Sequence, residues 1–338
     1  MGEFELIDTY FKRPERKAAR DSVAVLGIGD DCALLQPAAN TQIAISTDML
    51  VEGRHFLSTT DPASLGHKAL AVNLSDLAAC GARPLAFTLA LALPRADPAW
   101  LESFARGLFA LADAHGCELI GGDTTRGPLN ICITVFGEVP IVNGRAQALL
   151  RSGAQVGDDI YVSGTLGDAR LALEVFRGTV SVSADVFAMA RLRMEQPTPR
   201  VALGMALRGV ATSAIDVSDG LLGDLGHVLK ASGVGASIQG DVAVNLIAAY
   251  LRSSSASDSF AIEFPKEIRL GYVLAGGDDY ELAFTAPVAN RAAVREAARI
   301  SRTHVTHIGR IEAEGGLRLV NAAGRVVPYS WAAFDHFA

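Results

Sequence analysis

The sequence predicts a two-lobed α/β (α+β) protein, on three observations. The chain has 338 residues, and single hydrophobic cores usually stop growing near about 250–300 residues. Half of its residues are hydrophobic and a fifth are charged, which is ordinary for a globular protein with large cores. Predicted strands and helices interleave along the chain without a regular short repeat. We therefore expect an N-terminal lobe over residues 1–140 and a C-terminal lobe over residues 150–338.

Local signals in the first lobe predict two long helices between strands. Asp61 precedes a helix over residues 62–79, and Asp97 precedes a second helix over residues 98–115. Each helix begins with a proline and is followed by a glycine, which are typical start and stop residues. Apolar and β-branched runs predict strands at residues 42–47, 86–93, 118–121 and 129–138.

Residues 140–157 are rich in Gly, Arg and Ala, and we interpret them as the connection between the lobes. Strands are then expected at residues 159–163 and 214–217, and helices at 166–177, 184–194, 199–209 and 219–232. The small polar residues 253–259 predict a loop, and helix and strand alternate again after it.

Composition excludes several classes of partner. The net charge of −7 argues against a nucleic-acid-binding surface, and no run of like charges suggests contact with an anionic membrane. The longest apolar stretch, Leu85–Leu93, is far shorter than the ~20 residues of a membrane-spanning helix. The N-terminus lacks the apolar core of a secretory signal. Four scattered cysteines without a C-x-x-C pair are typical of reduced thiols, so we expect a cytoplasmic protein.

The most informative pattern is a set of aspartates that follow apolar segments in Gly-, Ser-, Thr- or Asn-containing motifs. Mg²⁺ prefers hard oxygen ligands, and neighbouring glycines let backbone N–H groups approach a phosphate. The motifs are Gly29-Asp30-Asp31, Ser46-Thr47-Asp48, Asn73-Leu74-Ser75-Asp76, Gly121-Gly122-Asp123-Thr124, Asp216-Val217-Ser218-Asp219-Gly220 and Gly276-Gly277-Asp278-Asp279.

Any one of these motifs is more often a simple turn, because Asp bonds its own backbone and Gly tolerates positive φ. Six of them together favour function, since crowded carboxylates repel one another unless cations neutralise them. The chain has no G-x-x-x-x-G-K-[ST] and no G-x-G-x-x-G before a helix. A P-loop kinase, a dinucleotide fold and a protein kinase are therefore not supported. The pattern predicts Mg²⁺ around a polyphosphate, provided that the fold brings the aspartates together.

Read jointly, these motifs resemble those of thiamine-monophosphate kinases, in the same order and over nearly the whole chain. The segments that carry the resemblance are Gly27–Ala33, Ser46–Leu50, Ala71–Ala79, Gly121–Gly127, Ile215–Leu221 and the tail from Trp331 to Phe337. That family is similar to aminoimidazole-ribonucleotide synthetase and selenophosphate synthetase. The resemblance implies an N-terminal ATP- and metal-binding lobe that forms a homodimer through its sheet.

The resemblance also implies a role for individual residues. ATP and several Mg²⁺ ions would serve ATP-dependent phosphorylation of thiamine monophosphate to thiamine diphosphate by direct in-line transfer. Asp48 and Asp123 would be the catalytic residues, holding the ions that bridge the donor and acceptor phosphates. Mg²⁺ would be ligated by Asp31, Ser46, Thr47, Asp48, Asp76, Asp123 and Asp216, with Asp219 holding a further ion. ATP would contact Gly122, Asp123, Arg151 and Ser218. Thiamine monophosphate would contact His55, Asp278 and Phe334.

Some of these residues have simpler interpretations. His55 is equally a packed loop histidine, Arg151 a solvated surface residue, and Phe334 with Trp331 an apolar clasp for the C-terminus. Many relatives have Glu where this chain has Asp278, which shortens the side chain by one methylene. Two alternative functions remain: another ATP-dependent reaction of the superfamily, such as cyclo-ligation or selenophosphate synthesis, and a nucleotide- and metal-binding module without catalysis.

Overall fold

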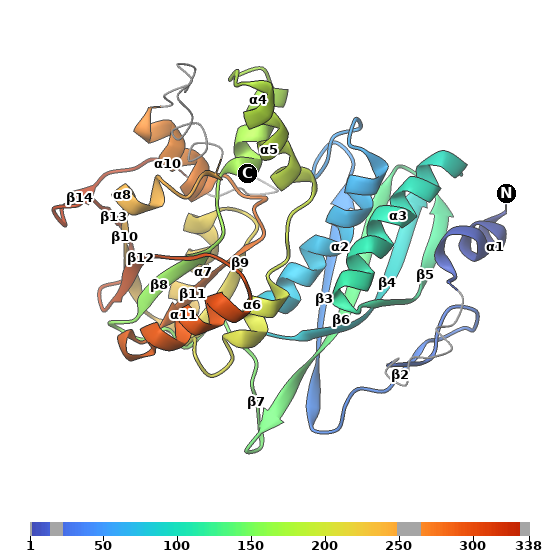
Figure 1. Ribbon diagram of the computed structural model, residues 1–338, viewed down its shortest axis with the longest axis horizontal. Coiled ribbons are helices and arrows are strands. Elements are labelled where there is room, and N and C mark those ends of the chain that lie inside the picture. Colours follow the sequence, from blue (N-terminus) through green and yellow to red (C-terminus); the bar gives the residue numbers. More distant parts are fainter. Residues whose placement is uncertain (1, 14–22, 249–264, 332–338) are drawn as a thin grey trace. The chain divides into compact units, whose positions relative to one another are not determined.

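The computed structural model describes residues 2–13, 23–248 and 265–331. The chain divides into two compact units (Figure 1). Unit 1 comprises Met1–Leu77 and Ala82–Gln147, and unit 2 comprises Ala78–Gly81 and Ala148–Ala338. The predicted loop at residues 253–259 lies outside the described residues. Within the described ranges, no helix is long and apolar enough to cross a membrane.

Unit 1 is built on a mixed sheet in the order β3-β6-β4-β5, with β7 added to β6. These strands are β3 (Thr41–Val51), β4 (Arg83–Leu93), β5 (Glu118–Arg126), β6 (Asn130–Val142) and β7 (Arg145–Ala146). A short antiparallel pair, β1 (Ala24–Leu26) with β2 (Leu34–Leu35), precedes the sheet. The N-terminus forms α1 (Glu3–Leu6) and a π-helical turn, η1 (Ile7–Phe11).

Two helices cover one face of this sheet, α2 (Pro62–Ala79) and α3 (Pro98–His115), and Figure 1 shows them side by side. Both helices have the predicted bounds. The Asp97 carboxylate caps α3 by accepting from the N–H groups of Ala99 and Trp100, and Gly116 ends it at φ 61°. The helices touch through glycine, since a Cβ on Gly107 would lie 1.8 Å from the Ala63 carbonyl oxygen.

The strands extend further than predicted, and this changes where the aspartates sit. Asp48 was expected just beyond a strand ending at residue 47, but β3 continues to Val51 and pairs with β6 along its whole length. Asp123 likewise lies inside β5, where it pairs with Ala90. The ladder with a neighbouring strand satisfies backbone N–H and C=O groups, so it continues through polar residues that local propensity would place in a loop.

Unit 2 contains a seven-stranded sheet in the order β14-β13-β10-β12-β8-β11-β9. The strands are β8 (Asp159–Ser163), β9 (Ser213–Val217), β10 (Gly235–Gln239), β11 (Glu281–Ala286), β12 (Val305–Glu312), β13 (Gly316–Val320) and β14 (Val326–Val327). The helices are α4 (Asp168–Phe176), α5 (Ala184–Glu195), α6 (Val201–Ala206), α7 (Leu221–Ser232), α8 (Gly240–Ala243), α10 (Lys266–Ala275) and α11 (Arg291–Ile300), with a 3₁₀ turn, η2 (Val288–Asn290).

The core of unit 2 joins this sheet to its helices. Buried side chains from β8 and β9 pack with Leu225 and Val228 of α7 and Val273 of α10. Strands β8, β9 and β11 are buried along their whole length, including their polar residues Asp159, Asp216 and Glu281. Mixed sheets with helices in both units confirm the predicted α/β (α+β) class.

Candidate active site

Three of the predicted residues meet on the helix-covered face of unit 1. Ser46 and Asp48 are two residues apart on β3, so their side chains point to the same face. The Ser46 hydroxyl donates to Asp76 Oδ2 of α2 at 2.5 Å, and the Asp48 N–H donates to Asn73 Oδ1 at 3.0 Å. Strand β3 and helix α2 therefore place the Ser46 hydroxyl on the Asp76 carboxylate, and they hold the Asp48 backbone against Asn73 on the same helix.

Thr47 points to the opposite face of the sheet. Its hydroxyl is 2.8 Å from the hydroxyl of Thr134 on β6. The structure therefore separates Thr47 from Ser46 and Asp48, although the three residues are consecutive.

Asp123 also lies apart from Asp48 within one copy of unit 1. Strands β3 and β5 form opposite edges of the order β3-β6-β4-β5, and three spacings of about 4.8 Å separate them by roughly 14 Å. Asp48 pairs with buried Ile133 on the helix-covered face, whereas Asp123 pairs with exposed Ala90 on the open face. Mg²⁺–oxygen bonds are about 2.1 Å long, so one copy of this unit does not place both aspartates on a common ion.

Gly122 is required by the sheet itself. Its φ is 148°, and a Cβ at this position would lie 1.9 Å from the Leu89 carbonyl oxygen of β4. Any side chain here would push β5 away from β4 and displace Asp123. A glycine predicted to approach a phosphate is therefore also a structural necessity.

His55 and Asp31 lie in turns. His55 follows β3, and its Nδ1 accepts a hydrogen bond from the Val51 N–H at 2.9 Å. Asp31 is exposed between β1 and β2, and its N–H donates to the neighbouring Asp30 carboxylate at 2.8 Å. The Asp30 carboxylate therefore helps to order the Asp31 backbone.

Unit 2 brings four predicted residues together at one end of its sheet. Asp216 is buried near the end of β9, and Ser218 and Asp219 follow directly. The Asp278 N–H donates to the Ser218 carbonyl oxygen at 2.7 Å, so the segment before β11 lies against this loop. Asp278 and Tyr280 have φ of 63° and 53°. Such backbone conformations are unfavourable for these residues and concentrate at functional sites.

A carboxylate that sequence reasoning missed anchors this loop. Asp224 of α7 accepts hydrogen bonds at its Oδ2 from the N–H groups of Ser218, Asp219 and Gly220, at 3.0, 3.1 and 3.1 Å. Burial, and then the Asp219 charge, raise the pKa of Asp224 to about 7. An acidic residue in the first turn of a helix that follows a glycine loop was the available signal, because it suits orphan N–H groups there.

Replacing Asp224 with Ala is expected to destabilise unit 2 by about 2 kcal/mol, because three loop N–H groups lose their acceptor. Asp224→Asn keeps one acceptor oxygen and should lose less than half of that. Urea denaturation of the purified variants measures both. Equal stability of Asp224→Ala and the wild type would show that the loop does not depend on this carboxylate.

Arg151 lies at the other end of β9. The neighbouring Leu150 carbonyl oxygen accepts from the N–H of Ala214, near the start of the strand, while Ser218 follows its end. Four residue steps of about 3.4 Å separate the two positions by roughly 14 Å. Phe334, the remaining predicted substrate contact, lies outside the described residues.

The donor set suits a hard divalent cation. Asp31, Asp123 and Asp219 form no ion pair with any lysine, arginine or histidine in the described ranges, so no cation among those residues neutralises them. Their carboxylates, with the Ser46 hydroxyl, are the oxygen ligands that Mg²⁺ prefers. No three Asp, Glu, His or Cys side chains among the described residues are close enough to form a complete metal site by themselves. Added ligands, such as phosphate oxygens and water, would have to complete the coordination.

Comparison with known proteins identifies the relatives of both units. Residues 29–139 match the AIR synthase related protein N-terminal domain, and residues 155–321 match the C-terminal domain of the same family. The chain is 46% identical over 339 residues to thiamine-monophosphate kinase of Salmonella typhimurium, covering 100% of this chain and 98% of that protein. It is 47% identical over 342 residues to the Escherichia coli enzyme, with the same coverage.

Solved structures agree with the sequence relatives. The thiamine-monophosphate kinase of Stenotrophomonas maltophilia superposes with a TM-score of 0.79 at 46% identity, covering 89% of this chain and 92% of that one. AaThiL complexed with AMPPCP and TMP gives a TM-score of 0.72 at 27% identity, covering 89% of each chain. By full-length identity and fold, the chain belongs to the thiamine-monophosphate kinases of the AIR synthase related family.

Proposed function

We propose that the protein phosphorylates thiamine monophosphate to thiamine diphosphate with ATP as the phosphoryl donor. The observation that carries this proposal is identity of 46–47% over the whole chain to two thiamine-monophosphate kinases. AaThiL, which has the same fold, was solved in complex with AMPPCP and TMP. The protein is thus a phosphotransferase whose acceptor is itself a phosphate group.

Several Mg²⁺ ions are part of this proposal. Unit 1 would hold them through Asp31, Ser46, Thr47, Asp48, Asp76 and Asp123, and unit 2 through Asp216 and Asp219. When bound, Mg²⁺ neutralises phosphate charge and orients the phosphoryl group for transfer. The unneutralised carboxylates described above support this assignment.

The residues of the chain have mainly to bind and orient the two substrates. The acceptor is already an anionic phosphate oxygen, so no strong general base is needed, and direct in-line transfer requires no phosphorylated enzyme intermediate. ATP would contact Gly122, Asp123, Arg151 and Ser218. Thiamine monophosphate would contact His55, Asp278 and Phe334, where a carboxylate suits the thiazolium cation and an aromatic ring can stack on it.

An acceptor panel tests the assignment. ADP release by purified protein with ATP and Mg²⁺ should depend on thiamine monophosphate, with aminoimidazole precursors and selenide giving no more than background. ADP release that depends on an aminoimidazole precursor or on selenide would favour another reaction of the superfamily. Binding of ATP–Mg²⁺ in calorimetry with no turnover on any acceptor would favour a non-catalytic module.

We also propose a homodimer formed through the open face of the unit 1 sheet. Ile43, Ile45 and Met49 of β3 point to this face and are 39, 63 and 51% exposed. Contiguous exposed apolar side chains mark interaction sites, and a second copy is the partner that the family resemblance implies.

We also propose a cytoplasmic location, which the four free cysteines support.

The Ile45→Asp variant is expected to shift the protein from dimer to monomer, because each subunit would bury a carboxylate at the interface. Sedimentation velocity at micromolar concentration measures the change, and Ile300→Asp on exposed α11 is the matched control. Dimers that persist unchanged in Ile45→Asp would place the interface elsewhere.

A further inference from the structure

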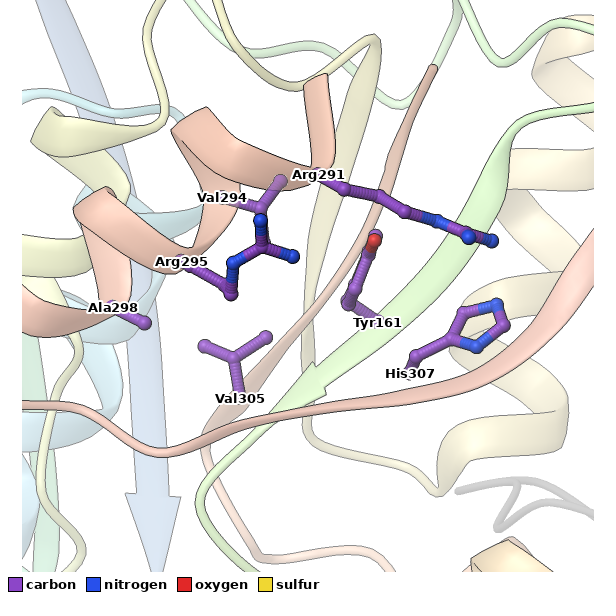
Figure 2. Close-up of a pocket in the computed structure, with 7 residues that line it drawn as sticks. All are labelled: Tyr161, Arg291, Val294, Arg295, Ala298, Val305 and His307. Atoms are coloured by element: carbon purple, nitrogen blue, oxygen red, sulfur yellow. The ribbon is translucent and has the colours of Figure 1, made fainter. Parts of the chain in front are cut away.

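A cavity of about 220 Å³ in unit 2 is separate from the residues described above. It lies between helix α11 and strands β8 and β12 (Figure 2). Ser218 follows the end of β9 and Asp278 precedes the start of β11. The residues that line the cavity come from α11, β8 and β12, so it shares no residue with the Ser218 and Asp278 segments.

The positive charge of Arg291 beside this cavity is balanced by the buried carboxylate of Asp159. Asp159 is 2% exposed and accepts from Arg291 Nε and Nη2 at 2.6 and 2.9 Å, and from the Tyr161 hydroxyl at 3.1 Å. The Arg291 hydrogen bonds lower the pKa of Asp159 and outweigh its burial. Asp159 is thus ionised, and Arg291 neutralises it.

A second arginine, Arg295, adds a positive charge, and none of the residues that the structure describes pairs with it. Arg295 lies one helical turn after Arg291, so both side chains lie on the same side of α11, and Figure 2 shows them around one space. Arg295 forms no ion pair within residues 2–13, 23–248 and 265–331, and no acidic side chain lines the cavity. One net positive charge remains even when His307 is neutral.

His307 supplies a second polar group that lacks a good partner. Its Nε2 is shielded from solvent and makes no hydrogen bond of normal geometry within the described ranges, although it lies 3.3 Å from Asp159 Oδ1. Leaving a buried donor or acceptor without a partner costs about 1–3 kcal/mol, so a neutral polar group would be favoured here, whereas an anionic oxygen would face the Asp159 carboxylate.

The remaining wall is apolar and the space is small. Val294, Ala298 and Val305 line it beside the Tyr161 ring. Its volume is below the range of about 300–1,000 Å³ that is usual for drug-sized ligands. The occupant is therefore smaller than a nucleotide and has an apolar body beside its charge.

We propose that this cavity binds a small organic oxyanion, with the charged group on Arg295 and an apolar body against Val294, Ala298 and Val305. A planar carboxylate matches the guanidinium fork of Arg295. Binding here is independent of the proposed transfer reaction, since none of these residues belongs to the proposed ATP, metal or thiamine monophosphate contacts.

Calorimetric titration of the full-length protein with benzoate tests the proposal, with inorganic phosphate as the probe that lacks an apolar body. We expect saturable benzoate binding that weakens about tenfold in Arg295→Gln, as expected for loss of a charge-assisted hydrogen bond. Ala298→Leu should abolish it by filling the space. Arg299→Gln is the matched control, because Arg299 lies one turn further along α11 and pairs with exposed Glu296.

Turnover without benzoate should be the same in all four proteins, which also shows that the variants fold. Absence of benzoate binding to the wild type, or binding that survives both Arg295→Gln and Ala298→Leu, would overturn the proposal. Phosphate binding as tight as that of benzoate would overturn the role of the apolar wall.

Discussion

Replacing Asp48 with Asn is expected to lower kcat for thiamine diphosphate formation by at least about 10²–10³-fold. The substitution keeps the size and shape of the side chain but removes the negative charge that would hold Mg²⁺ beside Asp76 and Ser46. The fold should survive, because the bond to Asn73 is made by the Asp48 backbone N–H, which Asn retains. A coupled ADP-release assay measures the effect, and circular dichroism checks the fold.

The control for this prediction is Glu102→Gln, which removes one carboxylate charge from an exposed position on α3. It should leave kcat unchanged. Activity of Asp48→Asn within a factor of two of the wild type would reject a metal-binding role for this residue.

The largest loss of stability is expected from Glu281→Ala. Glu281 is fully buried and pairs with Arg193 at 2.7 Å and Arg200 at 2.5 Å, while the Ser163 hydroxyl donates to its Oε2 at 2.6 Å. Removing the carboxylate leaves two largely buried guanidinium groups without a counter-charge, which typically costs about 3–5 kcal/mol. The ion pairs of Glu281 in the wild type need not be strongly stabilising themselves. The loss of stability in the variant measures the cost of leaving the two arginines without a counter-charge.

Guanidinium chloride denaturation of the variant measures this loss through the unfolding of unit 2. Glu296→Ala is the matched control, because Glu296 forms an exposed pair with Arg299 on α11. Exposed pairs contribute about 0–1 kcal/mol, so this variant should remain close to the wild type. A Glu281→Ala variant as stable as Glu296→Ala would mean that the two arginines find water or other acceptors.

Helix ends were predictable from sequence because their determinants are local. Asp97 accepts from N–H groups two and three residues ahead of it, and Gly116 adopts a left-handed conformation at the end of the same helix. Both effects act within one turn, so the residue types alone give the bounds of α3. The bounds of α2 follow from the same kind of signal.

Strand ends and sheet order were not predictable in this way. The position of Asp48 inside β3 depends on pairing with Ile133, which is 85 residues away in sequence. The separation of Asp48 from Asp123 depends on β6 and β4 lying between their strands. Neither fact is encoded in the spacing of the motifs, because pairing between distant strands is decided by packing on both faces of the sheet.

The candidate site was likewise predictable only in part. The motif residues Ser46, Asp48 and Asp76 come together in unit 1, and Ser218 and Asp278 come together in unit 2. Asp48 and Asp123 lie on opposite faces of one sheet, so one copy of unit 1 gathers only part of the predicted set. Asp224 was missed because its role is to hold backbone N–H groups, and no motif records the direction of a backbone. The roles of all the predicted residues in metal, ATP and substrate binding stay predictions.

The central claim is that this protein moves a phosphoryl group from ATP to the phosphate of thiamine monophosphate. ³¹P NMR of one reaction containing purified protein, ATP, thiamine monophosphate and Mg²⁺ tests it directly. We predict that the thiamine monophosphate resonance gives way to the two coupled resonances of thiamine diphosphate while ADP appears in equal amount, and that EDTA stops the reaction. An unchanged thiamine monophosphate resonance, with ATP either intact or hydrolysed to ADP and inorganic phosphate, would contradict the claim.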